Sequence, residues 1–150
     1  MKASEFNYPE ELRYTRNHEW ARFTMDQIEI GITDFGQNLL KQIVSIELPE
    51  INKQIVANNQ FGTIMRAPTD DEFETIFEVC APVSGKVVRI NELTIGQPDL
   101  INKDPYRAGW LLRVVPSNLE REWEALLSAN EYGIFVEEML AILEELRTDI

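Results

Sequence analysis

Few residues in this chain could do chemistry. His18 is the only histidine and Cys80 the only cysteine, so nucleophilic catalysis of the Ser-His-Asp or Cys-His type would have to pass through a single imidazole. His18 lies at the start of a predicted strand, where a structural or surface role is favoured over a catalytic one. One cysteine excludes an intrachain disulfide and a cysteine zinc cluster. These residue types favour a binding or carrier domain over an enzyme.

Three consecutive acids, Asp70, Asp71 and Glu72, could hold a hard cation, but a run of this kind is more often a solvated turn. They follow Pro68 and lie between two alternating segments, residues 61–67 and 73–79. Alternate side chains of a strand point to opposite faces, and Pro and Asp favour turns. The pattern therefore predicts a β-hairpin with an acidic tip, with Phe73 on the same face of the second arm as the other odd-numbered residues.

Composition and charge narrow the class of partner. The chain has 150 residues, 44% of them apolar, and a net charge of −12. A chain this acidic lacks the Lys/Arg surface that binds phosphates, which argues against nucleic acid and against an anionic membrane. No apolar run approaches membrane-spanning length, so a cytoplasmic protein that binds other proteins is expected.

The elements that would position the hairpin are short strands separated by turns, which are typical of a barrel or sandwich. Thr33 or Asp34 is expected to cap one short helix over residues 35–40, and a loop is expected around Pro98 and residues 102–105. From Leu119 the apolar period changes to that of a helix, and Asn130 is expected to cap a second helix. The apolar stripe of this helix either packs on the barrel or forms a partner or dimer surface.

Several short motifs together resemble the H-protein of the glycine cleavage system, over about residues 14 to 132. They are Tyr14-Thr15 with His18-Glu19-Trp20, Gly31-Ile32-Thr33-Asp34-Phe35, Leu48-Pro49-Glu50, Ala81-Pro82-Val83-Ser84-Gly85, Asn102-Lys103-Asp104-Pro105-Tyr106 and Gly109-Trp110-Leu111. The resemblance implies a mainly β fold with C-terminal helices: a lipoyl-domain flattened β-barrel of two packed sheets. It divides the chain into a lead-in (1–13), the barrel (14–116) and a helical extension packed on it (117–150).

The resemblance also implies a carrier role. In that family a lipoyl group on a hairpin lysine carries an aminomethyl group between the glycine decarboxylase, the aminomethyltransferase and the dihydrolipoyl dehydrogenase. The family hairpin reads Glu-Ser-Val-Lys-Ala, whereas residues 63–67 here are Thr-Ile-Met-Arg-Ala, and no lysine lies between Lys53 and Lys86. The hairpin is also about six residues longer than the family's. Arg66 cannot replace the lysine, because lipoylation needs a neutral amine and a guanidinium stays protonated.

Three functions follow from these features. The first is an H-protein-like domain without lipoate that acts by protein–protein contact, as a scaffold, decoy or regulatory subunit, with glycine cleavage enzymes or a related lipoate-dependent system as partners. The second is a true lipoyl carrier that uses Lys53, Lys86 or Cys80. The third is a small-molecule or metal-binding module at the acidic tip. The contact residues expected for the first function are Arg66, Thr69, Asp70, Asp71, Glu72 and Glu74.

Overall fold

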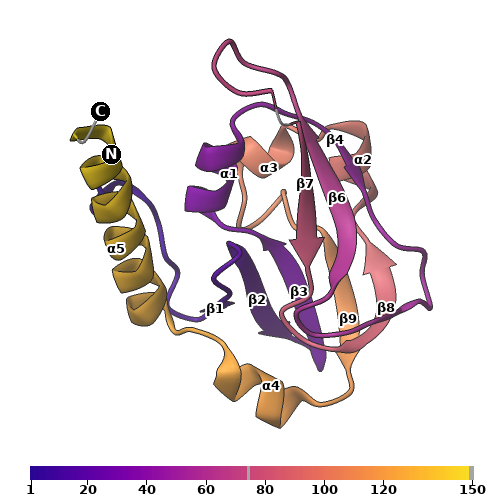
Figure 1. Cartoon of the computed structure of the whole chain (residues 1–150). Coiled ribbons are helices and arrows are strands. Elements are labelled where there is room, and N and C mark those ends of the chain that lie inside the picture. The colour runs from indigo at the N-terminus through magenta and orange to yellow at the C-terminus, as the bar shows by residue number, and fades with distance from the viewer. Residues whose placement is uncertain (74, 149–150) are drawn as a thin grey trace.

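Two antiparallel sheets face each other and enclose the main core (Figure 1). The structure is a computed structural model that describes residues 1–73 and 75–148. The larger sheet has the order β1 (Arg13–Tyr14), β2 (Glu19–Thr24), β3 (Gln27–Ile32), β9 (Leu112–Pro116), β8 (Gly85–Ile90) and β5 (Gln54–Ile55). The smaller sheet has the order β4 (Ile43–Glu47), β6 (Gln60–Arg66) and β7 (Ile76–Cys80).

Alternate residues of the central strands form this core, although Glu29 on the other face of β3 is also buried. On β3, Ile28 and Ile30 point inward, while Glu29 between them points outward; Leu112 and Val114 on β9 likewise flank the outward Arg113. Burying such aliphatic side chains is the main favourable term in folding, at about 25 cal/mol per Å² of apolar surface. The mainly β architecture expected from the sequence is confirmed, although in the described residues the strands form two separate sheets rather than a closed barrel.

Within residues 14–116, the number of helices differs from the expectation. Helix α1 (Asp34–Leu40) is the predicted short helix, and Thr33 is its cap, because its hydroxyl accepts a hydrogen bond from the Gly36 amide. The prediction of only one internal helix was wrong: α2 (Glu92–Gly96) and α3 (Leu100–Lys103) occupy the segment expected to be a loop. Asn91 begins α2 by accepting from the Leu93 amide, a capping signal that the flanking Pro and Asn residues obscured.

Two helices follow the last strand, α4 (Leu119–Ala125) and α5 (Ala129–Thr148). Ser128, not Asn130, caps α5: its hydroxyl accepts from the Glu131 amide, and the Glu131 carboxylate accepts from the Ser128 amide. The first half of α5 packs against β1 and the short helix η1 (Ala3–Glu5). A second core forms there around Tyr14, Trp20, Phe35, Tyr132 and Val136.

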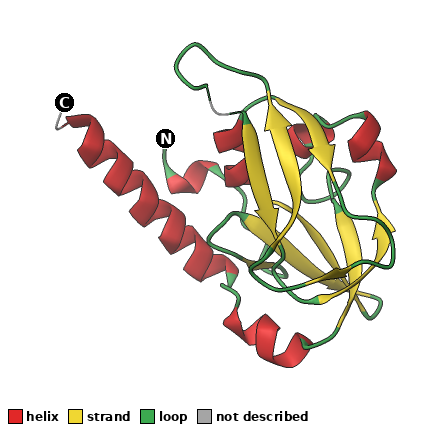
Figure 2. Ribbon diagram, turned by 45° about the vertical axis from the view of Figure 1, so that its right-hand side comes forward, coloured by secondary structure: helices red, strands yellow, loops and turns green. Residues whose placement is uncertain are grey.

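The apolar stripe of α5 therefore divides in two. Tyr132 and Val136 are fully buried, but Ile142, Leu143 and Leu146 near the end of the helix are exposed. Figure 2 shows α5 running obliquely past the two sheets, with its C-terminal turns extending away from them. Among the described residues, no helix has the length and apolar character needed to cross a membrane.

Candidate functional site

The hairpin predicted from the sequence is present, but its tip is wider than expected. Strands β6 and β7 are paired antiparallel as far as Met65 and Ile76, and the Arg66 amide donates to the Thr75 carbonyl (2.8 Å). The second strand begins at Ile76, so Phe73 belongs to the connecting loop and its side chain is 86% exposed. The assignment of Phe73 to the second strand of the hairpin, on one face with the other odd-numbered residues, was therefore wrong.

The acidic tip is a structured turn. The Thr69 hydroxyl accepts from the Glu72 amide (3.1 Å), and the Thr69 amide donates to the Glu72 carbonyl (3.3 Å). Asp70, Asp71 and Glu72 are exposed, so these tip residues are accessible to another molecule. Glu74, the sixth residue expected at the contact, lies outside the described residues.

Arg66 lies inside the base of the tip rather than on its surface. Its side chain is 2% exposed, forms an ion pair with Glu72, and lies 5.1 Å from the centre of the Phe77 ring. A side chain buried in this way cannot be a direct contact for a partner. Its ion pair with Glu72 links the loop to the end of the sheet.

Sequence reasoning missed the apolar side chains beside the acids. Met65 and Ile76 are directly paired on β6 and β7, and both are exposed, as is Phe73 in the loop. The alternation of buried Ile64 and Arg66 with exposed Met65 on β6 is the signal that could have located them. The tip thus combines carboxylates with exposed apolar groups, a composition suited to contact with a protein surface.

A cavity of about 540 Å³ lies below the hairpin, between β6, β7, the start of β2 and α1. Ile64, Phe77 and Leu39 form an apolar part of its wall, and His18 and Glu19 are among the polar residues that line it. The two sheets and α1 must all be in place before this cavity exists, so nothing local in the sequence indicates it.

Glu19 is the unusual residue of this cavity, because it carries a carboxyl group and only 1% of its surface is exposed. Its carboxylate accepts hydrogen bonds from the Thr15 hydroxyl, the Asn17 amide group (2.6 Å) and the Cys80 backbone amide (3.0 Å). Burial raises the pKa of Glu19 from 4.5 to about 7, although these hydrogen bonds act in the opposite direction. The carboxyl can therefore hold or release a proton near neutral pH.

His18 is neutral at the same pH. Burial lowers the pKa of His18 from 6.5 to about 4. Its Nδ1 lies 2.8 Å from the Tyr132 hydroxyl, which is also 2.8 Å from the Thr33 hydroxyl. These contacts link the residue before β2 and the cap of α1 to α5, which gives His18 a place in the packing of the second core.

The three other residues considered for lipoyl attachment lie away from the hairpin tip. Lys86 is exposed within β8, where it pairs with Gln54 of β5. Lys53 lies in the turn directly before β5. Cys80 ends β7 and is half-buried, and burial raises the pKa of its thiol, with Glu19 acting in the same direction. In the described part of the chain, no group of three or more His, Cys, Asp or Glu side chains is arranged to hold a metal ion.

Comparison with known proteins places these features in context. The model of the glycine cleavage H-protein family matches residues 12–139. The glycine cleavage system H protein of Geobacillus thermodenitrificans (strain NG80-2) is 40% identical over 132 residues, covering 88% of this chain and 98% of the relative. That of Anaeromyxobacter sp. (strain K) is 41% identical over 130 residues, covering 87% and 96%. The crystal structure of a glycine cleavage system H protein from Mycobacterium marinum has a TM-score of 0.68 and 31% identity, and covers 83% of this chain and 94% of that one.

Proposed function

Because the chain belongs to the glycine cleavage H-protein family, we propose that it is an H-protein-like domain that carries no lipoate and acts through protein–protein contact. H-proteins are carriers rather than catalysts, so no catalytic residue is assigned. The observation that supports the proposal is the hairpin itself. It has no lysine, and the one cationic side chain at its base, Arg66, is buried and paired with Glu72.

The remaining nucleophiles are poor substitutes for a hairpin lysine. Lys86 lies within a paired strand, and Lys53 lies in the turn directly before the edge strand β5, so neither lies on the β6–β7 hairpin. Thiolate is the reactive form of cysteine, and the raised pKa of Cys80 reduces its thiolate population. We therefore assign no cofactor to this chain, and no metal to the tip.

The proposed contact surface is the hairpin tip. Thr69, Asp70, Asp71 and Glu72 provide its polar part, and Phe73 its most exposed apolar group. Arg66 supports this surface from inside through its ion pair. The partners proposed are glycine cleavage enzymes or those of a related lipoate-dependent system, in the cytoplasm, with this chain as scaffold, decoy or regulatory subunit.

Two alternatives rest on specific observations. Identity of 40% over nearly the whole length of a named H protein favours a true lipoyl carrier. The exposed end of α5, with Ile142, Leu143 and Leu146, favours a dimer through the helical extension. Sedimentation velocity at increasing concentration tests the dimer. If the dimer forms, the apparent mass should increase with concentration, and Leu143→Glu should abolish the increase.

Intact mass after co-expression with a lipoyl ligase and lipoate tests the main proposal. We expect no lipoyl adduct on the natural chain. A chimera that carries the hairpin of the Geobacillus relative should be lipoylated, which shows that the ligase accepts the scaffold. Arg66→Lys should stay unmodified because position 66 is buried. A lipoyl-sized mass increase on the natural chain would establish the carrier alternative, and peptide mapping would locate the residue.

A further inference from the structure

The outer face of the larger sheet carries a line of charged side chains across four strands. Arg22 on β2 pairs with Glu29 on β3, Glu29 pairs with Arg113 on β9, and Arg113 pairs with Arg89 on β8. Directly paired residues share a face of the sheet. Because their chain neighbours on β3 and β9 point into the core, this row faces outward.

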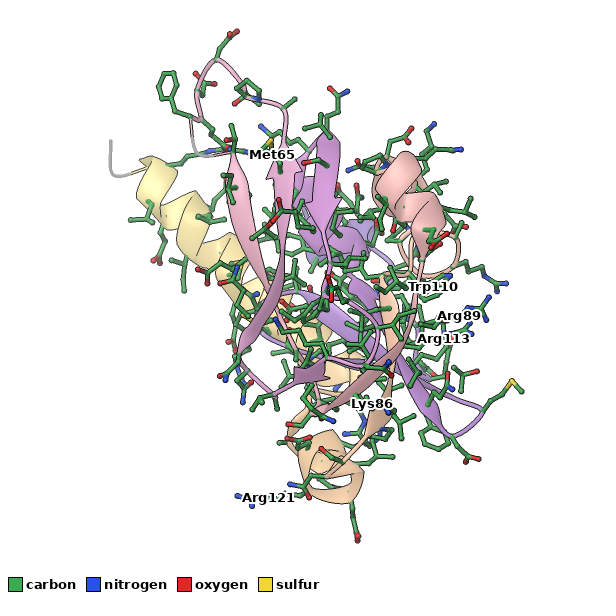
Figure 3. The ribbon with its side chains drawn as sticks, turned by 90° about the vertical axis from the view of Figure 1, so that its right-hand side faces the viewer. Met65, Lys86, Arg89, Trp110, Arg113 and Arg121 are labelled. Atoms are coloured by element: carbon green, nitrogen blue, oxygen red, sulfur yellow. The ribbon has the colours of Figure 1, made fainter. Side chains whose placement is uncertain are left out.

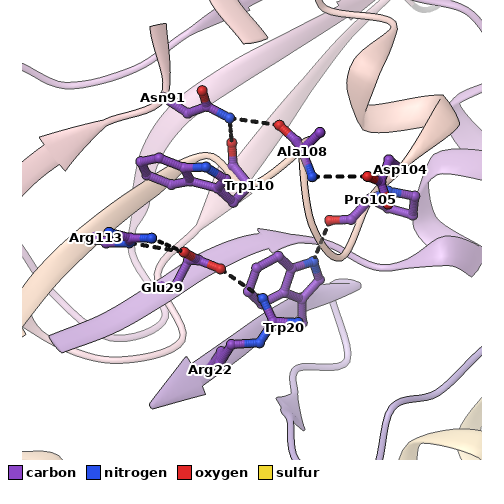
Figure 4. A network of polar contacts seen from close by, with 9 residues as sticks. All are labelled: Trp20, Arg22, Glu29, Asn91, Asp104, Pro105, Ala108, Trp110 and Arg113. Atoms are coloured by element: carbon purple, nitrogen blue, oxygen red, sulfur yellow. Dashed lines mark hydrogen bonds and ion pairs between the residues drawn. The ribbon is translucent and has the colours of Figure 1, made fainter. Parts of the chain in front are cut away.

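Glu29 balances only part of this positive charge. Its carboxylate is bound by Arg22 through Nη1 (2.8 Å) and by Arg113 through Nη2 (2.8 Å) and Nε (2.9 Å), as Figure 4 shows. Arg113 is thereby held in one orientation, with its guanidinium 4.7 Å from the centre of the Trp110 ring. Three arginines and one carboxylate leave the row with surplus positive charge.

Arg89 and Lys86 extend the positive charge along β8. Both side chains are exposed, and within residues 1–73 and 75–148 neither forms an ion pair. The Arg89 guanidinium lies 6.0 Å from the Trp110 ring, and Lys86 pairs with Val115, whose side chain is also exposed. Figure 3 shows Arg89, Trp110 and Arg113 close together, with Lys86 further along β8, the strand of Arg89.

We propose that this basic-aromatic face, formed by Lys86, Arg89, Trp110, Arg113 and Val115, binds an acidic segment of a partner protein. A guanidinium presents a planar fork that matches a carboxylate. Glu29 and Trp110 hold Arg113 in place, and Arg89, which lies 6.0 Å from the centre of the same ring, carries the exposed fork. Arg and Trp are the residue types most enriched among interface hot spots. Exposed Val115 offers an apolar contact between the charges.

The charge of the whole molecule selects a short acidic segment over a phosphate polymer. At a net charge of −12, the chain repels a long polyanion at a distance, and a polyanion would extend beyond the face onto acidic surface. A short segment with a few Asp or Glu side chains contacts only the basic-aromatic face. This surface lies on the sheet opposite the hairpin sheet, so the proposal is independent of whether the hairpin carries lipoate.

The test uses the unmodified full chain with ¹⁵N-labelled tryptophan and a short peptide of alternating glutamate and alanine. The chain has three tryptophans, and Trp20 provides an internal reference because it is buried and donates its indole N–H to the Pro105 carbonyl (3.0 Å). We expect the peptide to shift the Trp110 indole signal in a saturable way and to leave Trp20 unchanged. The same peptide with glutamine in place of glutamate should produce no shift.

Charge reversal locates the binding. Lys86→Glu/Arg89→Glu should weaken binding about tenfold or more, the sum expected for two exposed charge contacts. Lys2→Glu/Lys41→Glu changes net charge equally at exposed positions elsewhere and should leave affinity nearly unchanged. Equal losses in both variants, equal binding of the glutamine peptide, or no shift at Trp110 would each overturn the proposal. Tighter binding of a short single-stranded DNA than of the glutamate peptide would also overturn it, in favour of a nucleic-acid surface.

Discussion

Substitution of Glu19 and of His18 should change the pH dependence of stability in opposite directions. Glu19 has its pKa raised from 4.5 to about 7 by burial, so the protonated form is favoured in the folded state. Its contribution to stability is fully present below pH 4.5 and is lost as pH rises to about 7. His18 has its pKa lowered from 6.5 to about 4. Its contribution is fully present above pH 6.5 and is lost as pH falls to about 4.

The two contributions are of similar size. Each pKa differs from its unfolded value by roughly 2.5 units, and at 1.36 kcal/mol per unit this is about 3 kcal/mol for each group. Between pH 4.5 and 6.5 the two contributions change with pH in opposite directions, so they largely cancel in the stability of the natural chain. Each single variant should therefore show the pH dependence of the group that it retains.

Two variants separate the effects. Glu19→Gln removes the carboxyl, so its free energy of unfolding minus that of the natural chain should rise by about 3 kcal/mol between pH 4.5 and 7. His18→Asn suits a residue whose φ is 69°, because Asn tolerates the left-handed region. Its difference from the natural chain should fall by about 3 kcal/mol between pH 4 and 6.5.

Urea unfolding followed by tryptophan fluorescence at a series of pH values provides the measurement. Both quantities are differences, so the titration of surface carboxylates cancels. Loss of hydrogen bonds to Thr15, Asn17 or Cys80 shifts the Glu19→Gln curve by a constant amount and does not change its slope. Flat difference curves, or slopes of the same sign for both variants, would refute the assignment of buried, shifted groups at these positions.

Two further substitutions test the packing and the hairpin. Gly31→Ala should lower the melting temperature, with a loss of about 1–3 kcal/mol from overpacking, because a Cβ at this position would lie 2.4 Å from the Trp20 ring. Gly96→Ala is its control in calorimetry: a Cβ there meets nothing within 4 Å, so a comparable loss in both variants would contradict the explanation. Glu72→Gln removes the ion pair with Arg66. It should speed proteolytic cleavage within residues 67–75, while the melting temperature changes little. An unchanged cleavage rate would show that the pair does not hold the tip.

The local structure of this protein follows closely from its sequence. Alternating residues on β3 and β9 predict which side chains enter the core, because a strand has a two-residue period whatever it pairs with. Thr33 predicts the start of α1, since its hydroxyl satisfies the backbone amide of Gly36, the third residue of the helix. The acidic tip and the absence of a hairpin lysine are also properties of the sequence alone, as are the motifs that indicate the family.

The tertiary structure decided everything that depends on neighbours distant in the chain. Arg66 is a surface cation by composition, but the return of the loop places Glu72 and Phe77 against it and buries it. Glu19 becomes a buried acid because β7 brings the Cys80 amide to it. The line from Arg22 through Glu29 to Arg113 exists because β9 lies between β3 and β8. Local periodicity specifies the face of each strand, whereas the order of strands depends on long-range pairing, which no short segment of sequence contains.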